Sequence, residues 1–130
     1  MSEWNADQYL KFEIQRTQPS LDLVNRIKDC SPSTVLDIGC GPGNSTSIIK
    51  KVFPEAKVIG IDSSRNMIEK ASFCYPNLHF QLCNVNSLKG KYDVIFSNAC
   101  LQWVPEHVHL IPRLIKENLN DGGIIAVQFP

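Results

Sequence analysis

The sequence has no C-x-x-C pair, no long apolar run and no excess of either charge. Its cysteines are odd in number, so the pattern indicates neither a disulfide framework nor a zinc knot, and we expect reduced thiols in a cytoplasmic protein. The apolar runs are too short to span a bilayer, and no basic-then-apolar signal opens the chain. The three histidines lack metal-ligand spacing, so no metal site is predicted.

The charges of the chain balance, with 13 basic and 13 acidic residues. A nucleic-acid surface needs an excess of Lys and Arg on one face, so this balance argues against such a partner. A small-molecule substrate fits better. At 130 residues the chain has the length of one domain, and its composition is ordinary for a globular protein.

Segments with strand and helix character alternate along the chain. Strands are predicted over 34–38, 57–61, 78–82, 92–97 and 124–129. Helices are predicted over 19–28 and 45–53, from Ser63 or Ser64 to Pro76, and from about His109, so that Pro112 lies in the first turn. Asp121-Gly122-Gly123 should form the turn into the fifth strand. The alternation predicts an α/β fold with a doubly wound, Rossmann-like parallel sheet, whose ligand lies beyond the carboxyl ends of the strands.

Three glycines, Gly39, Gly41 and Gly43, stand between the first strand and the next helix. Glycine lets a backbone come close to a ligand, and a helix N-terminus offers N–H groups and a positive dipole end to an anionic group. Asp62 closes the following strand, about 20 residues beyond the turn, where a carboxylate can accept hydrogen bonds from a ribose. The pattern predicts a site for a nucleoside-containing cofactor.

The glycine spacing distinguishes two classes of cofactor. The dinucleotide fingerprint G-x-G-x-x-G would place its third glycine at position 44, which is Asn44 here. Asp37, just before the turn, favours the ammonium group of an amino acid over a pyrophosphate. The motif D-x-G-x-G-x-G, with an acidic residue closing the next strand, resembles the class I methyltransferases that use S-adenosylmethionine. An ordinary glycine-rich turn and a nicotinamide dinucleotide site are the alternatives.

Three further segments are similar to the trans-aconitate methyltransferases: 4–12 with 16–19, 97–105 and 119–128. The second of them includes Asn98-Ala99-Cys100-Leu101-Gln102-Trp103. That fold continues with further helices and an antiparallel strand pair. The resemblance therefore predicts that 1–130 is one S-adenosylmethionine-binding domain, truncated after the fifth strand. A shortened family member is the alternative. The fifth strand would then expose an apolar edge, through which the chain could self-associate.

The resemblance also implies cofactor-binding roles, residue by residue. Gly39, Cys40 and Gly41 would run along the methionine part, with Asp37 and Asn44 beside them. Asp62 would bind both ribose hydroxyls. Ser63, Met67, Asn84 and Val85 would contact the adenine, although Met67 could equally be core and Asn84-Val85 a polar loop. Asn98, Ala99 and Gln102 would face the transferable methyl group. Tyr9 and Arg16 would close over the cofactor, unless their helix is simply a solvated amphipathic one.

The implied function is transfer of a methyl group from S-adenosylmethionine to a small carboxylic acid. A carboxylate is already ionised at neutral pH and needs no general base, so no catalytic residue is assigned. A non-catalytic domain that binds the nucleoside cofactor, or serves as an interaction module, is the alternative from another class. A nicotinamide oxidoreductase is a third.

Overall fold

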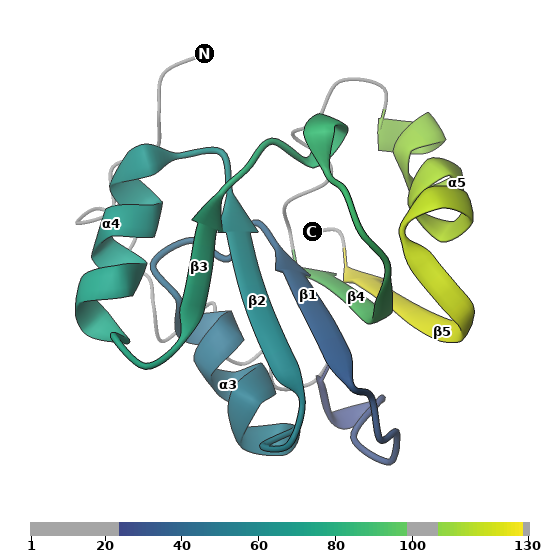
Figure 1. Ribbon diagram of the computed structural model, residues 1–130, viewed down its shortest axis with the longest axis horizontal. Helices are drawn as coiled ribbons and strands as arrows, with labels where there is room; N and C mark the ends of the chain where they lie inside the picture. The colour runs from purple at the N-terminus through teal and green to yellow at the C-terminus, as the bar shows by residue number, and fades with distance from the viewer. Residues whose placement is uncertain (1–23, 99–106, 129–130) are drawn as a thin grey trace.

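The computed structural model describes residues 24–98 and 107–128, and within them five strands form one parallel sheet (Figure 1). The strand order is β3-β2-β1-β4-β5. The strands are β1 (Thr34–Ile38), β2 (Lys57–Asp62), β3 (His79–Leu82), β4 (Tyr92–Asn98) and β5 (Leu119–Gln128). The chain thus runs outward from β1 to β3, returns to the other side of β1, and continues to β5. This is the doubly wound arrangement that the alternation predicts.

In the described part of the chain, three α-helices and one 3-10 turn lie between successive strands. They are α3 (Asn44–Val52), α4 (Arg65–Cys74), η1 (Val85–Ser87) and α5 (His107–Glu117). The sequence allows Ser63 or Ser64 as the N-terminal cap of α4, and the structure uses Ser64, whose hydroxyl accepts a hydrogen bond from the Met67 N–H at 3.2 Å. In Figure 1, α4 lies beside β3 at one edge of the sheet and α5 beside β5 at the other.

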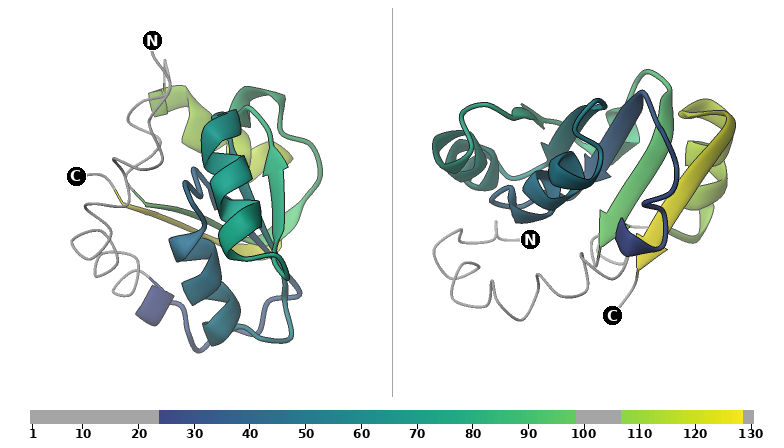
Figure 2. Two further views of the ribbon diagram at one scale, coloured as in Figure 1. Left: turned by 90° about the vertical axis from the view of Figure 1, so that its left-hand side faces the viewer. Right: turned by 90° about the horizontal axis from the view of Figure 1, so that it is seen from below.

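Helices α3 and α5 lie on opposite faces of the sheet (Figure 2), and each covers an apolar core. Successive residues of a strand point to opposite faces. Val35 accordingly packs in the core that contains Ile49 of α3, whereas Leu36 packs in the core that contains Leu114 of α5. The first core also holds Val24 and residues of the other central strands. The central strands are therefore buried on both sides, as expected for a parallel sheet with helices on each face.

Helix α5 differs from its sequence prediction in where it begins. It starts at His107 rather than near His109, so Pro112 lies in its second turn and not its first. Proline lacks the N–H that would bond to the carbonyl four residues earlier, which is why we predicted a later start. The burial of Leu110 and Leu114 against the sheet offsets that lost bond.

The fifth strand begins earlier than predicted. Asp121-Gly122-Gly123 lies within β5 instead of preceding it, and the register with β4 jumps from Tyr92↔Leu119 to Val94↔Ile124. Gly122 has a φ of +76°, which suits the irregularity. The residue types predicted a turn before the strand, but pairing with β4 on both sides of the segment makes it an irregularity within β5.

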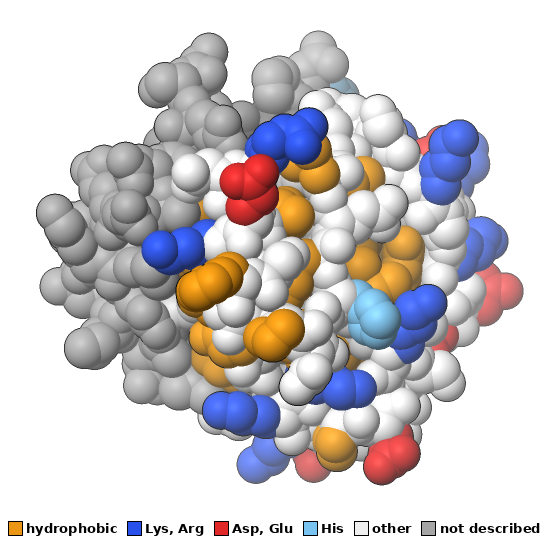
Figure 3. Space-filling view, turned by 60° about the vertical axis from the view of Figure 1, so that its left-hand side comes forward, with side chains coloured by type: hydrophobic (Ala, Val, Ile, Leu, Met, Phe, Trp, Pro, Cys, Tyr) orange, Lys and Arg blue, Asp and Glu red, His pale blue; other side chains and the backbone are white. Residues whose placement is uncertain are grey.

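Apolar side chains are exposed on the side of the molecule that carries α4 and β3 (Figure 3). Among the described residues β2 is the one strand that pairs with β3, and Phe73 and Leu82 are 84% and 41% exposed. None of the helices that the structure describes has the length and apolar character needed to cross a membrane.

Asp93, near the start of β4, joins three strands at the amino end of the sheet. One carboxylate oxygen accepts the backbone N–H groups of Ser33 (2.8 Å) and Thr34 (3.3 Å), and the other accepts the Asn120 side-chain amide (2.9 Å). The Asp93 N–H donates in turn to the Thr34 hydroxyl at 3.0 Å. Hydrogen bonds from Asn120 and Ser33 hold the pKa of this carboxyl below its ordinary 3.8.

Replacing Asp93 with alanine should destabilise the fold by about 1–2 kcal/mol at neutral pH, because charge-assisted hydrogen bonds are lost at a partly exposed site. A lowered folded-state pKa means that Asp93 stabilises the fold above pH 3.8 and loses this contribution as the pH falls through the folded value. Urea unfolding of D93A at pH 7 and pH 3.5 tests this, with D121A, an exposed position, as control. Equal differences from wild type at both pH values would contradict the assignment.

Candidate functional site

The carboxyl ends of the strands bring the predicted cofactor residues to one edge of the sheet. Ile38 pairs with Ile61 on one side and with Ser97 on the other, and Asp62 pairs with Leu82. The chain places β2 and β3 on one side of β1, and then β4 and β5 on its other side. This edge therefore contains the switch point of the fold. Ligands of open α/β sheets bind at such a point.

The glycine turn is folded tightly against the end of β2. Gly39, Gly41 and Gly43 have φ values of +74°, +57° and +100°, which side chains of L-residues rarely allow. The N–H groups of Gly39 and Cys40 both donate to the Ile61 carbonyl, at 2.8 and 2.9 Å. The sequence therefore needs its glycines here because of backbone conformation.

The N–H groups of the glycine turn itself are already bound within the protein. The Gly41 N–H donates to an Asp62 carboxylate oxygen, and the Gly43 N–H donates to the Cys40 carbonyl. These two N–H groups therefore already have hydrogen-bond acceptors within the protein. The available donors lie one step later, in the first turn of α3, where no side chain forms a capping hydrogen bond within the described residues. Unpaired amides at a helix N-terminus, together with its dipole, favour an anionic group.

Close packing beneath the turn fixes the start of α3. A Cβ on Gly60 of β2 would lie 2.7 Å from the Thr46 hydroxyl and 2.9 Å from the Cys40 Cβ. A Cβ on Gly43 would lie 2.8 Å from the Tyr75 ring. Cys40 itself is buried, and its thiol donates to the Gly41 carbonyl. The Cys40 side chain thus packs inside the protein beneath the turn.

Asp62 occupies the position predicted for a ribose acceptor. It is half-buried, and one carboxylate oxygen accepts the Gly41 N–H at 3.0 Å while the other accepts the Ser64 N–H at 2.9 Å. These two bonds orient the carboxylate between the glycine turn and α4. The main chain of Asp62 also accepts the Cys83 N–H, which joins this point to the segment after β3.

Asp37 is buried next to the turn, 1% exposed, and holds α3 in place. One of its carboxylate oxygens accepts the hydroxyls of Ser45 (2.6 Å) and Thr46 (2.7 Å). Burial raises the pKa of Asp37 to about 6, partly opposed by these two hydrogen bonds and aided by the nearby Asp62 charge. The site therefore contains an acidic group that is costly to ionise in the absence of a cation.

Replacing Asp37 with asparagine should stabilise the fold at pH 8, by about 3 kcal/mol at most, and leave it unchanged near pH 3.5. A raised folded-state pKa means that Asp37's contribution is fully present below pH 3.8 and is lost as the pH rises through about 6. The amide oxygen can still accept the Ser45 and Thr46 hydroxyls. Thermal unfolding across this pH range measures the effect. A loss of stability at pH 8 would contradict the burial argument.

The predicted adenine residues lie around the ends of β2 and β3. Ser63 is exposed, whereas Met67 is buried in α4 at 3% exposure, which suits a packing role as well as an adenine contact. Asn84 is exposed, and its side-chain oxygen accepts the Asn86 N–H at 2.9 Å, which begins η1. Val85 packs into the core that α5 covers. Contact of these residues with an adenine stays a prediction.

The remaining candidates are placed only in part. Asn98 is the last residue of β4 and pairs with Gln128. Tyr9, Arg16, Ala99 and Gln102 lie outside the described residues.

Sequence reasoning missed several residues that build this edge. Ser45 and Thr46 bind Asp37, and the buried Ser97 hydroxyl donates to the Ile38 carbonyl at 3.2 Å. The sequence does show hydroxyl residues directly after the glycine turn, so Ser45 and Thr46 could have been found. It does not show that they bind Asp37, because Asp37 lies on the other side of the turn. Among the described residues, no group of three His, Cys, Asp or Glu side chains could hold a metal ion.

Comparison with known proteins identifies the family. Residues 30–130 match the model of a family described as "Methyltransferase domain". The chain belongs to this methyltransferase domain family. Trans-aconitate 2-methyltransferases of Methylobacterium nodulans and Afipia carboxidovorans are each 44% identical to it over its whole length. A solved structure of the plantazolicin methyltransferase BpumL in complex with SAH superposes with a TM-score of 0.79 at 23% identity, and the match covers 94% of this chain and 51% of that one.

The methyltransferase domain has the fold that the resemblance implied, a Rossmann-like parallel sheet, and this prediction is confirmed. The chain spans about half the length of the curated relatives that it matches, 51% for the first two.

Proposed function

We propose that this chain is the S-adenosylmethionine-binding part of a cytoplasmic methyltransferase that methylates a small carboxylic acid. The observation that supports it most is the 44% identity with trans-aconitate 2-methyltransferases across the whole chain. The cysteines Cys30, Cys40, Cys74 and Cys83 are thiols rather than disulfides, which suits a reducing compartment.

The residues at the carboxyl edge of the sheet suit each part of S-adenosylmethionine. Asp62 offers a fixed carboxylate to the ribose hydroxyls, and the left-handed turn at Gly39 and Gly41 leaves room for the methionine part. The first turn of α3 offers amides to the methionine carboxylate. Asp37 lies close to this point, and an ammonium group nearby would favour its ionised form.

The cofactor supplies a methyl group bonded to a positively charged sulfur, and an ionised carboxylate can accept it without a base. The chain's part is to hold both groups in line and to exclude water. Such orientation contributes roughly 7–11 kcal/mol in well-aligned systems. This accounts for a site without a Ser-His-Asp or Cys-His arrangement among the residues proposed to bind the cofactor.

Calorimetry with SAH, the demethylated product, and with NAD tests the cofactor; SAH should bind and NAD should not. Transfer of a radiolabelled methyl group to trans-aconitate, to other small carboxylic acids and to an amine tests the acceptor. Labelling of the amine in preference to every acid would overturn the carboxylate proposal. Binding of SAH without transfer to any acceptor would favour a non-catalytic cofactor-binding domain.

We further propose that the 130-residue chain self-associates through β5. Among the described residues β4 is the only partner of β5, and a strand with an open edge can pair with a second copy. Sedimentation should therefore give a species larger than a monomer, and a charged substitution on this strand, I125K, should reduce it. A monomer at all concentrations would contradict the proposal.

A further inference from the structure

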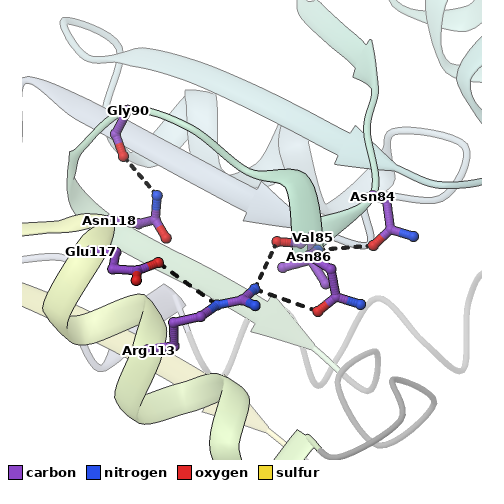
Figure 4. Close-up of polar contacts among 7 residues, drawn as sticks. All are labelled: Asn84, Val85, Asn86, Gly90, Arg113, Glu117 and Asn118. Carbon is purple, nitrogen blue, oxygen red and sulfur yellow. Dashed lines mark hydrogen bonds and ion pairs between the residues drawn. The ribbon is translucent and has the colours of Figure 1, made fainter.

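Helix α5 is joined to the turn that follows β3 by one basic side chain. Arg113 donates through a terminal nitrogen to the Val85 carbonyl at 3.2 Å and to the Asn86 side-chain oxygen at 3.4 Å (Figure 4). Its Nε lies 3.9 Å from the Glu117 carboxylate on the same helix. The hydrogen bonds to η1 are shorter than this exposed ion pair, which is worth little by itself.

The 3-10 turn η1 has few interactions of its own. It spans three residues, and Asn84, Asn86 and Ser87 are exposed. Short 3-10 turns have poorer hydrogen-bond geometry than an α-helix, so their conformation depends on their surroundings. The Val85 carbonyl accepts the Leu88 N–H within the turn and Arg113 from outside it. Arg113 therefore adds an external hydrogen bond at the first residue of η1.

A second tie joins the same loop to α5 farther from the cofactor edge. The side-chain amide of Asn118, just after α5, donates to the Gly90 carbonyl at 2.9 Å (Figure 4). The loop between β3 and β4 is thus held at two points, one at Asn84–Asn86 and one at Gly90. The two ties can be removed separately, which gives a matched control.

We propose that Arg113 is a positioning residue for base recognition: it holds η1 so that Asn84 and the Val85 N–H present a fixed pattern of donors and acceptors to the adenine. This inference rests on the proposed function, which assigns the adenine to Asn84 and Val85. Asn84 uses its side-chain oxygen to bind the Asn86 N–H, and Asn86 is also bound by Arg113. The two contacts of Arg113 therefore hold Val85 and the residue after it, and that residue in turn binds Asn84.

The test compares SAH with S-inosylhomocysteine, in which the base carries a carbonyl in place of the 6-amino group and a proton on N1. That change inverts the donor and acceptor pattern of the base edge. Wild-type protein should prefer SAH by roughly 10- to 100-fold, because a mismatched edge leaves hydrogen-bonding groups unpaired. R113M keeps the apolar stem of the side chain. It should lose about 10-fold in SAH affinity while S-inosylhomocysteine affinity stays nearly unchanged, so the preference collapses.

Four further variants separate positioning from stability. R113K keeps a charge and a donor, so it should retain part of the preference for SAH that R113M loses. N86A removes the side-chain oxygen that accepts from Arg113 and should lower the preference for SAH. N118A cuts the tie at Gly90 and should reduce thermal stability without changing the preference. E117Q should change nothing in either affinity beyond about twofold.

Each outcome assigns the result to one proposal. If R113M keeps the wild-type preference and loses affinity for both ligands equally, Arg113 has only a structural role. That result would overturn this inference alone. An equal loss of preference in N118A would overturn it as well. Wild-type protein that binds SAH and S-inosylhomocysteine equally would overturn the adenine assignment and this inference with it, and wild-type protein that binds neither would overturn the proposed cofactor.

Discussion

Replacing Asp62 with alanine should weaken the binding of SAH by roughly 10- to 100-fold, because a hydrogen bond to a charged group is worth about 1.5–3 kcal/mol. The proposed ribose hydroxyls would lose their acceptor. The structure adds a second effect, since Asp62 also accepts the N–H groups of Gly41 and Ser64. The variant should therefore lose thermal stability as well as affinity.

The S64A variant separates these two effects. It removes the hydroxyl that caps α4 by accepting the Met67 N–H, which costs about 0.5–2 kcal/mol of stability, but leaves the Asp62 carboxylate in place. Its SAH affinity should stay within about threefold of wild type. Calorimetry on both variants, with circular dichroism as a check on folding, measures the difference. Unchanged affinity in a folded D62A protein would rule out the ribose assignment.

The G41V variant should bind SAH more than about 100-fold more weakly, the largest loss that we expect from one substitution. Gly41 has a φ of +57° and is buried at the proposed methionine subsite. A branched side chain there strains the backbone by about 1–2 kcal/mol and occupies the space that a ligand needs. Calorimetry and thermal unfolding should show the loss of binding together with a moderate loss of stability.

Gly122 provides the matched control for G41V. It has a similar left-handed conformation, φ +76°, but a Cβ there would meet no atom within 4 Å, and it lies in the bulge of β5. G122V should therefore share the backbone strain and keep SAH binding within about twofold. Equal binding by G41V and G122V would mean that the glycines of the turn serve only the conformation of the chain.

The sequence was a good guide wherever the signal was local. Strand β1 over 34–38, the start of α4 after Ser64 and the parallel order of the elements were all predicted correctly. Each depends on apolar alternation, a capping side chain or the connection between neighbouring elements. The start of α5 was wrong because the cost of Pro112 is local, whereas the burial of Leu110 and Leu114 that offsets it is not.

The candidate site shows the same division. The sequence by itself determined the family, the glycine turn and the acidic residue at the end of β2, because these are residue types at fixed spacing. Only the tertiary structure decided which groups meet: Gly41 with Asp62, Asp37 with Ser45 and Thr46, and Arg113 with Val85. The physical reason is that a hydrogen bond between segments depends on strand order and register. These follow from packing on both faces of the sheet, and no spacing along the chain records them.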